Sequence, residues 1–186
     1  MLHDAINQAI RTFESIRGLE EDLGRATGLV SSALLNGNKL LACGNGGSAA
    51  DAAHLTTEFV CRFVDDRRPY PAICLNTHGG DLTAISNDYG YDFAFARQVR
   101  AFGKPGDVLI ALTTSGRSAN VTHALRAAKE IGVSSIAMLG RDGGESIGIA
   151  DVDLLVPGDK TIRIQEAHQL LLHTLCEVVE TMLPRD

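Results

Sequence analysis

The segment KLLACGNGGSAADAAHLTTEFVCRFV, residues 39–64, contains the pattern that decides the fold. It begins with an apolar run at 39–43, which is typical of a short strand buried on both faces of a parallel sheet. The turn GNGGS follows at 44–48, and residues 49–64 then have the pattern of a helix. A strand, a glycine-rich turn and a helix in this order begin a β-α-β unit, so the segment predicts a parallel sheet covered by helices.

The same alternation continues along the chain. Apolar runs predict further strands at 71–75, 107–112, 134–139 and 153–156. Helical patterns lie at 80–102, where we expect two short helices, and at 120–131 and 163–182. The fold class predicted is therefore α/β, with a doubly wound five-stranded parallel sheet flanked by helices.

An N-terminal helical arm precedes the sheet. Ile6, Ile10, Phe13 and Ile16 form one apolar stripe at helical spacing, Gly18 interrupts the pattern, and a second stripe runs from Leu23 to Leu34. An isolated arm cannot bury such stripes, so we expect it to pack on the domain or on another subunit. The chain is read as one domain over 1–186, with the arm at 1–36 and the α/β core at 37–186.

Composition excludes several classes of protein. The chain has 186 residues, with 17 Lys and Arg against 23 Asp and Glu, which gives a formal net charge of −6. An acidic chain is a poor general binder of nucleic acid or anionic membrane. No apolar run approaches the ~20 residues of a membrane-spanning helix, and the first residues lack the apolar core of a signal peptide. We therefore expect a cytoplasmic protein.

The cysteines give no sign of a disulfide framework. Cys43, Cys61, Cys74 and Cys176 form no C-x-x-C pair and stand at no zinc-finger spacing. In a chain of this size, such sparse cysteines are expected to be buried structural thiols.

Two turns that follow predicted strands have the composition of a phosphate site. The glycines of GNGGS allow positive φ and close approach of a ligand, and the start of the next helix favours an anion. The second turn, TTSGRS at 113–118, adds four hydroxyls and a flexible glycine. Each turn alone is also compatible with ordinary Ser/Thr caps, but two of them favour phosphate binding.

A nicotinamide site is disfavoured. Gly44, Gly46 and Ala49 match the dinucleotide fingerprint formally, and Asp65 and Asp66 follow at about the expected separation. That fingerprint requires its acidic residue at the end of the second strand, whereas both aspartates precede the strand at 71–75.

Titratable side chains on two predicted helices suggest chemistry. His54 and Glu58 are four residues apart and share a helix face, which suits a metal site, a general acid/base pair or a solvated surface pair. On the last helix Gln165 is three residues from His168 and eight from His173. Eight residues rise ~12 Å, so spacing alone does not choose between the two histidines.

Three motifs together, GNGGSAADAAHLTTE, TTSGRSAN and RIQEAHQLLLH, resemble the sugar isomerase (SIS) domain family, and within it the phosphoheptose isomerases. The likeness covers nearly the whole chain and implies an SIS-type sheet. By position it implies substrate contacts at the two turns, at the Asn-Asp pair of AISNDYG and on the last helix. These residues are Asn45, Gly46, Gly47, Ser48, Asn87, Asp88, Thr113, Thr114, Ser115, Ser118 and Gln165.

The resemblance also implies one zinc ion per subunit, held by His54, Glu58, Gln165 and His173, and thus favours His173 over His168. It implies a homotetramer with active sites at subunit interfaces. Thr161 and Ile162 stand where some members carry an acidic residue, and Ala49 stands where some have a histidine.

The activity implied is an aldose–ketose isomerisation of sedoheptulose 7-phosphate to D-glycero-D-manno-heptose 7-phosphate, for lipopolysaccharide-type heptose synthesis. Such a reaction moves a proton between C1 and C2 through an enediol, so we expect Glu58 as base and His173 as general acid, with zinc polarising the carbonyl. The alternatives are an isomerase of another phosphosugar and a non-catalytic SIS adaptor that binds a phosphosugar or a replication-initiator protein. The adaptors lack the carboxylate and the last histidine, and their presence here favours the enzyme.

Overall fold

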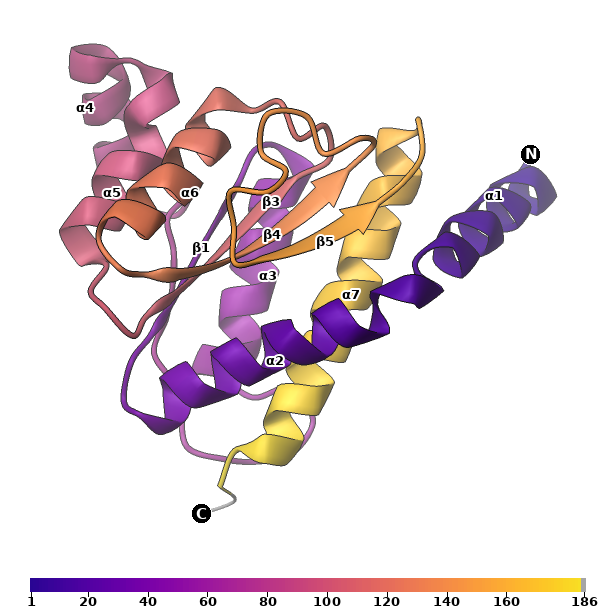
Figure 1. Cartoon of the computed structure of the whole chain (residues 1–186), viewed down its shortest axis with the longest axis horizontal. Coiled ribbons are helices and arrows are strands. Elements are labelled where there is room, and N and C mark those ends of the chain that lie inside the picture. Colours follow the sequence, from indigo (N-terminus) through magenta and orange to yellow (C-terminus); the bar gives the residue numbers. More distant parts are fainter. Residues whose placement is uncertain (185–186) are drawn as a thin grey trace.

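A computed structural model describes residues 1–184 as helices packed on both faces of one sheet (Figure 1). The strands are β1 (Leu40–Gly44), β2 (Ala72–Cys74), β3 (Val108–Thr113), β4 (Ser134–Gly140) and β5 (Val152–Val156). They pair in the order β2-β1-β3-β4-β5, and every pairing is parallel. The predicted doubly wound, five-stranded parallel sheet is confirmed.

The helices follow the predicted alternation. They are α1 (Leu2–Ser15), α2 (Glu20–Leu35), α3 (Gly47–Val60), α4 (Gly79–Tyr89), α5 (Ala94–Phe102), α6 (Ala119–Glu130) and α7 (Thr161–Met182), with short 3-10 turns η1 (Arg17–Leu19) and η2 (Tyr91–Phe93). A parallel sheet needs crossovers between its strands, and helices provide them here, as in other α/β folds.

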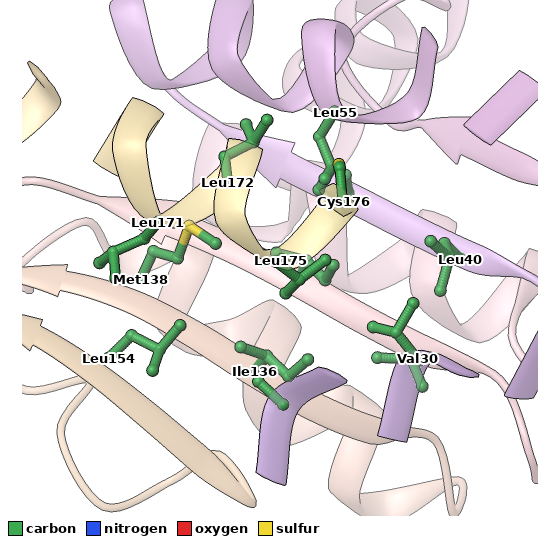
Figure 2. Packing of buried hydrophobic residues seen from close by; sticks show 14 of the residues in the cluster. Val30, Leu40, Leu55, Ile136, Met138, Leu154, Leu171, Leu172, Leu175 and Cys176 are labelled. Atoms are coloured by element: carbon green, nitrogen blue, oxygen red, sulfur yellow. The ribbon is translucent and has the colours of Figure 1, made fainter. Parts of the chain in front are cut away.

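Two hydrophobic cores lie on opposite faces of the sheet. On one face α2, α3 and α7 pack on the strands: Figure 2 shows Leu175 of α7 above Ile136, and Leu55 of α3 next to Cys176 of α7. On the other face α5 and α6 cover side chains such as Leu41 and Leu109. Successive residues of a strand point to opposite faces, so a fully buried parallel strand must be apolar throughout.

The order of the strands fixes where a ligand site can form. From β1 the chain passes to β2 on one side, and it later returns to β3 on the other side of β1. In open α/β sheets, ligands bind at the carboxyl ends of the strands where the winding reverses, here between β1 and β3. The turns GNGGS and TTSGRS leave these two strands, so both lie at that point although β2 separates them in sequence.

The first helix of the arm buries no residue of its own. Ile6 and Ile10 are about half exposed, at 48% and 51%, and Phe13 is 36% exposed. The second stripe behaves differently, because Ala26, Val30 and Leu34 of α2 are buried in the core. The stripe on α1 therefore has only part of its surface covered within one chain.

The helix after GNGGS is shorter than predicted and ends at Val60 rather than residue 64. Arg67 caps its last turn, since the guanidinium donates to the carbonyl oxygens of Glu58 (2.6 Å) and Phe59 (3.0 Å). The carboxylate of Glu180 accepts from the backbone N–H groups of residues 63–65. These contacts turn the chain out of the helix.

The cysteines, all within the described residues, are free. Burial raises the pKa of the Cys43 thiol, and burial also raises the pKa of Cys176 to about 12. Cys74 is buried too, but the prediction of a buried thiol is wrong for Cys61, which is exposed because α3 ends one residue before it. Among residues 1–184, no helix combines the length and apolar character needed to cross a bilayer.

Candidate active site

The GNGGS turn is held in place by its neighbours on the sheet. The Asn76 side chain at the end of β2 accepts from the Gly44 backbone N–H (3.2 Å) and donates to the Gly44 carbonyl (2.8 Å). Gly46 has φ +56°, a conformation that favours glycine. A Cβ on Gly47 would overlap the side-chain amide of Gln165, so glycine allows α7 to approach this turn.

The TTSGRS turn gathers hydroxyl groups. The Thr113 hydroxyl lies 3.4 Å from that of Ser115 and 3.2 Å from that of Ser118. Ser118 precedes α6, yet its hydroxyl makes no capping bond to the backbone of that helix in the described structure. The hydroxyls thus face one another at the helix start, which is the arrangement expected of a phosphate cradle rather than of a plain N-cap.

Positive charge at this turn is directed elsewhere. Arg117 makes a two-pronged ion pair with Asp142, at 2.7 and 2.8 Å, and both side chains are exposed. Hydrogen bonding to Arg117 holds the pKa of Asp142 well below its usual range. A phosphate at this turn would therefore rely on hydroxyls and backbone N–H groups more than on a basic side chain.

The two turns are joined by side chains. Asn45 of GNGGS makes two hydrogen bonds with Asn120, the second residue of α6, and its Oδ1 also accepts from the Tyr91 hydroxyl at 2.7 Å. The structure thus brings together Asn45, Gly46, Gly47 and Gln165, with the hydroxyls of the second turn nearby. Ser48 is buried in the first turn of α3.

Asn87 and Asp88 lie near this group without reaching it. They stand at the end of α4, and the Asn87 amide donates to the Asp88 carboxylate at 2.8 Å rather than to either turn. Both are exposed, and Tyr91, three residues after Asp88, is the side chain from this region that contacts Asn45.

A second cluster lies farther along α3. His54 Nε2 is 2.8 Å from Glu58 Oε1, and the rings of His54 and His173 meet edge to face with centroids 5.0 Å apart. Phe63 also packs against His173, with ring centroids 5.9 Å apart. His54, Glu58 and His173 therefore gather at one place, with the Glu58 side chain 17% exposed.

Gln165 does not join that cluster within one chain. Helices α3 and α7 run side by side in the same direction, because Gln165 meets Gly47, Gln169 bonds Asp51, and His173 meets His54. Gly47 and His54 are seven residues apart, a rise of about 10 Å. In the part of the chain that the structure describes, no three His, Cys, Asp or Glu side chains are arranged to hold a metal ion.

His168 lies away from both clusters. It is fully buried on α7, and its Nε2 lies 3.0 Å from the Leu139 carbonyl oxygen. Burial lowers the pKa of His168, while the contact with Leu139 and the charge of Asp51 raise it by less. Its side chain is thus part of the core, and His173 is the histidine of α7 that faces His54.

Four polar residues near these clusters were not assigned a role from the sequence. The short polar side chains of Asn76 and Asn120 each bond to a partner that is remote in sequence. Arg67 and Glu180 form an ion pair at 3.5 Å and hold the segment that places Phe63 on His173. An acidic residue on the apolar face of α7 was the available signal for Glu180, because buried carboxylates require partners.

A cavity of about 360 Å³ opens between α1 and the start of α7, lined by groups that include Arg11, Lys160 and Arg163. None of the predicted catalytic or metal-binding residues lines it. The predicted site residues lie instead at the two turns, at the end of α4 and along α3 and α7, and Ser48 and Thr113 among them are buried.

Comparisons with known proteins agree on one family. The sequence model of the SIS domain matches residues 5–140. The chain is 50% identical over 176 residues to a phosphoheptose isomerase of Bordetella avium, covering 93% of this chain and 89% of that protein. It superposes on the structure of phosphoheptose isomerase GmhA from Neisseria gonorrhoeae with a TM-score of 0.90, 42% identity and 97% of both chains covered. A phosphoheptose isomerase from Francisella tularensis gives a TM-score of 0.93 at 34% identity, over 97% of this chain and 96% of that one.

The buried position of His168 predicts an acid-sensitive contribution to stability. Because the folded-state pKa is lowered, the unfolded chain takes up a proton first as the pH falls. The contribution is complete above the unfolded pKa of about 6.5 and is lost progressively below it. In His168→Gln, the urea midpoint should fall less steeply than in wild type between about pH 7 and pH 5.

His3→Gln provides the control, since His3 is exposed on α1. It should keep the wild-type slope of urea midpoint against pH. Parallel slopes for wild type and His168→Gln would show that His168 is not the source of the acid sensitivity.

Proposed function

Since the chain belongs to the phosphoheptose isomerases of the SIS-domain family, and is thus a phosphosugar isomerase, we propose that its substrate is sedoheptulose 7-phosphate. The product would be D-glycero-D-manno-heptose 7-phosphate, formed by aldose–ketose isomerisation. The observation that carries this proposal is the pairing of Glu58 with His54 and His173, a base and an acid at one place on α3 and α7. An SIS adaptor would have no need of both groups.

The proposed chemistry assigns one task to each group. Glu58 removes the proton from the carbon next to the carbonyl, and His173 donates a proton to the substrate oxygen, so that an enediol forms and collapses to the other isomer. His54 orients Glu58 through the 2.8 Å contact. The hydroxyls of Thr113, Ser115 and Ser118 hold the phosphate and fix which carbon meets Glu58.

The spacing of these groups favours a site shared between subunits. Glu58 stands eleven residues after Gly47, which is about 16 Å along α3. An extended seven-carbon sugar with its phosphate spans roughly 10 Å, given carbon–carbon bonds of about 1.5 Å. A substrate held at the turns of one chain would therefore be completed by Glu58 and His173 from another chain.

We propose a homotetramer, and the apolar stripe on α1 supports it. The stripe of Ile6, Ile10 and Phe13 on α1 is largely exposed in one chain. An apolar helix face exposed to water is unfavourable unless another surface covers it. A second copy of the chain is the partner that the resemblance implies.

We propose that one zinc ion per subunit binds His54, Glu58 and His173, with Gln165 of another subunit as a fourth ligand. Two imidazoles and a carboxylate are a donor set typical of zinc. Support comes from His54 Nε2 and Glu58 Oε1, two atoms of this donor set that lie 2.8 Å apart, but the described side chains of one chain do not by themselves surround an ion. Bound zinc would supply Lewis acidity toward the carbonyl oxygen, at the cost of making the coordinated Glu58 a weaker base.

The proposed setting is cytoplasmic synthesis of heptose for lipopolysaccharide-type glycoconjugates. Four free cysteines suit a reducing compartment, and the proposed product is a phosphorylated heptose. The ligands proposed are the sugar phosphate and sister subunits, with no nucleic acid and no membrane.

The function is tested by an isomerase assay on sedoheptulose 7-phosphate with the metal content measured in parallel. We expect conversion with exchange of a solvent proton into C1 or C2, loss of activity with a chelator, and recovery on adding zinc. Absence of exchange in the untreated enzyme would contradict the proposed substrate. Full activity after complete removal of metal would contradict the zinc proposal alone.

Replacing the proposed base tests the mechanism. Glu58→Gln keeps the size of the side chain and removes its basicity, so kcat should fall by about 10²- to 10⁴-fold. The melting temperature should change little, since the amide keeps the size of the side chain and its oxygen can still accept from His54 Nε2. Glu177→Gln is the matched control on the exposed face of α7 and should keep wild-type kcat. Near wild-type turnover by Glu58→Gln would contradict the assignment of Glu58 as the base.

The arm can be tested by adding charge to its stripe. Ile6→Asp combined with Ile10→Asp should lower the molar mass measured by light scattering, because charged groups cannot be buried at an apolar interface without a large penalty. Far-ultraviolet circular dichroism should remain that of a folded chain, since α1 has no buried residue, while activity falls with the loss of shared sites. A double variant that keeps the mass of the wild type would exclude the stripe from the interface.

A further inference from the structure

Asn120 is a buried amide with one unusual partner. Its side chain is 3% exposed and forms a reciprocal pair with Asn45, in which Asn45 Nδ2 donates to Asn120 Oδ1 (2.9 Å) and Asn120 Nδ2 donates to Asn45 Oδ1 (3.0 Å). Asn45 belongs to the turn after β1 and Asn120 to the helix after the second turn. The pair is thus a direct bond between the two turns at the centre of the site.

The chain's own backbone fixes the orientation of both amides. The Val121 backbone N–H donates to Asn120 Oδ1 at 2.9 Å, and a backbone N–H can only donate. The atom of the Asn120 amide that faces the Val121 N–H must therefore be its oxygen. The other end of the amide, which faces Asn45 Oδ1, is then its NH₂ group. The side of Asn45 that meets this NH₂ group must then be its oxygen, so neither amide can be turned over without losing a bond.

A third group uses up the oxygen of Asn45. The Tyr91 hydroxyl donates to Asn45 Oδ1 at 2.7 Å, in addition to the bond from Asn120. An amide oxygen accepts about two hydrogen bonds, whereas the NH₂ group of Asn45 has used only one of its two N–H bonds. Asn45 is half-buried and therefore faces a ligand as a hydrogen-bond donor, and it cannot act there as an acceptor.

We propose that Asn120 is a positioning residue, assisted by Tyr91, that fixes Asn45 as a hydrogen-bond donor toward an oxygen atom of the sugar phosphate. This inference rests on the proposed function, in which Asn45 contacts the substrate. It assigns to Asn120 and Tyr91 an action through Asn45 rather than on the substrate itself. It also ties the position of the first turn to that of the second.

An amide held in one orientation can select between ligand atoms that accept and ligand atoms that donate a hydrogen bond. An amide free to rotate could present its oxygen or its NH₂ group with similar ease. Once Asn120 and Tyr91 hold the oxygen, a ligand that offers an acceptor oxygen is bound and one that offers only a donor is left unpaired, which costs free energy in a partly buried site.

The test uses Asn120→Asp in the intact enzyme. The substitution keeps the shape and the acceptor for Val121, but it places a carboxylate oxygen against Asn45 Oδ1, where the NH₂ group stood. We expect kcat/KM for sedoheptulose 7-phosphate to fall by about 10- to 100-fold, mainly through KM, as expected for loss of a ground-state contact. Tyr91→Phe removes one hydroxyl and should lower kcat/KM by about 2- to 10-fold.

Gln98→Glu is the matched control. Gln98 is 2% exposed on α5, and its Nε2 donates to the Ala94 carbonyl oxygen at 3.1 Å, so the change also sets an acid against a buried oxygen. It should lower the melting temperature at least as much as Asn120→Asp and leave kcat/KM near that of wild type. If both variants lose activity in proportion to their loss of stability, Asn120 is structural and the proposal is overturned.

A second comparison separates this proposal from the proposed function. In an Asn45→Ala background, Asn120→Asp should cause no further loss of kcat/KM, whereas multiplication of the two effects would overturn action through Asn45. If the wild-type enzyme is inactive on sedoheptulose 7-phosphate, the proposed function fails. A crystal structure of Asn120→Asp then tests the positioning role by itself. An unchanged Asn45 amide in that structure would contradict the positioning role, and a turned amide would support it.

Discussion

The parallel direction of all five strands is the constraint on which the site depends. It places every carboxyl end at one edge of the sheet, and the order β2-β1-β3-β4-β5 sets the turns after β1 and β3 beside each other. Neither turn needs a long excursion to meet the other, so two short side chains, Asn45 and Asn120, can bridge them. An antiparallel sheet would send successive turns to opposite edges and could not bring them together in this way.

The packing of α3 on α7 transmits that constraint to the groups proposed to be catalytic. Gln165, Gln169 and His173 of α7 meet residues of α3 that lie progressively farther from the GNGGS turn. Because helices are rigid at this length, the distance between Gln165 and His173 is set by their separation in sequence. The proposed base, Glu58, therefore lies about three turns along α3 from the GNGGS turn of its own chain, and this separation favours a site completed by a neighbour.

Much of this arrangement could be predicted from the sequence, and what could not depended on tertiary partners. The strands and helices followed from apolar periodicity to within a few residues, with the largest error at the end of α3. That end is set by Arg67 and Glu180, whose partners lie as far as 117 residues apart along the chain. Spacing left His168 and His173 undecided because both lie on one helix, and only packing shows that His168 faces Leu139 in the core. Cys61 is exposed for the same reason that α3 ends early.

The net charge of −6 is compatible with an anionic ligand because local groups, rather than the total, decide the potential at a turn. Arg117 is neutralised by Asp142, so the field at TTSGRS comes from hydroxyl dipoles, backbone N–H groups and the start of α6. As a phosphate site, such a turn would bind less strongly than an arginine pair. That suits an isomerase, because the phosphate group is the same in substrate and product. Tight binding of a group that does not change during the reaction lowers KM without raising kcat. The groups that distinguish substrate from product must then lie at the other end of the sugar, where the proposed Glu58 and His173 of a neighbouring subunit would act.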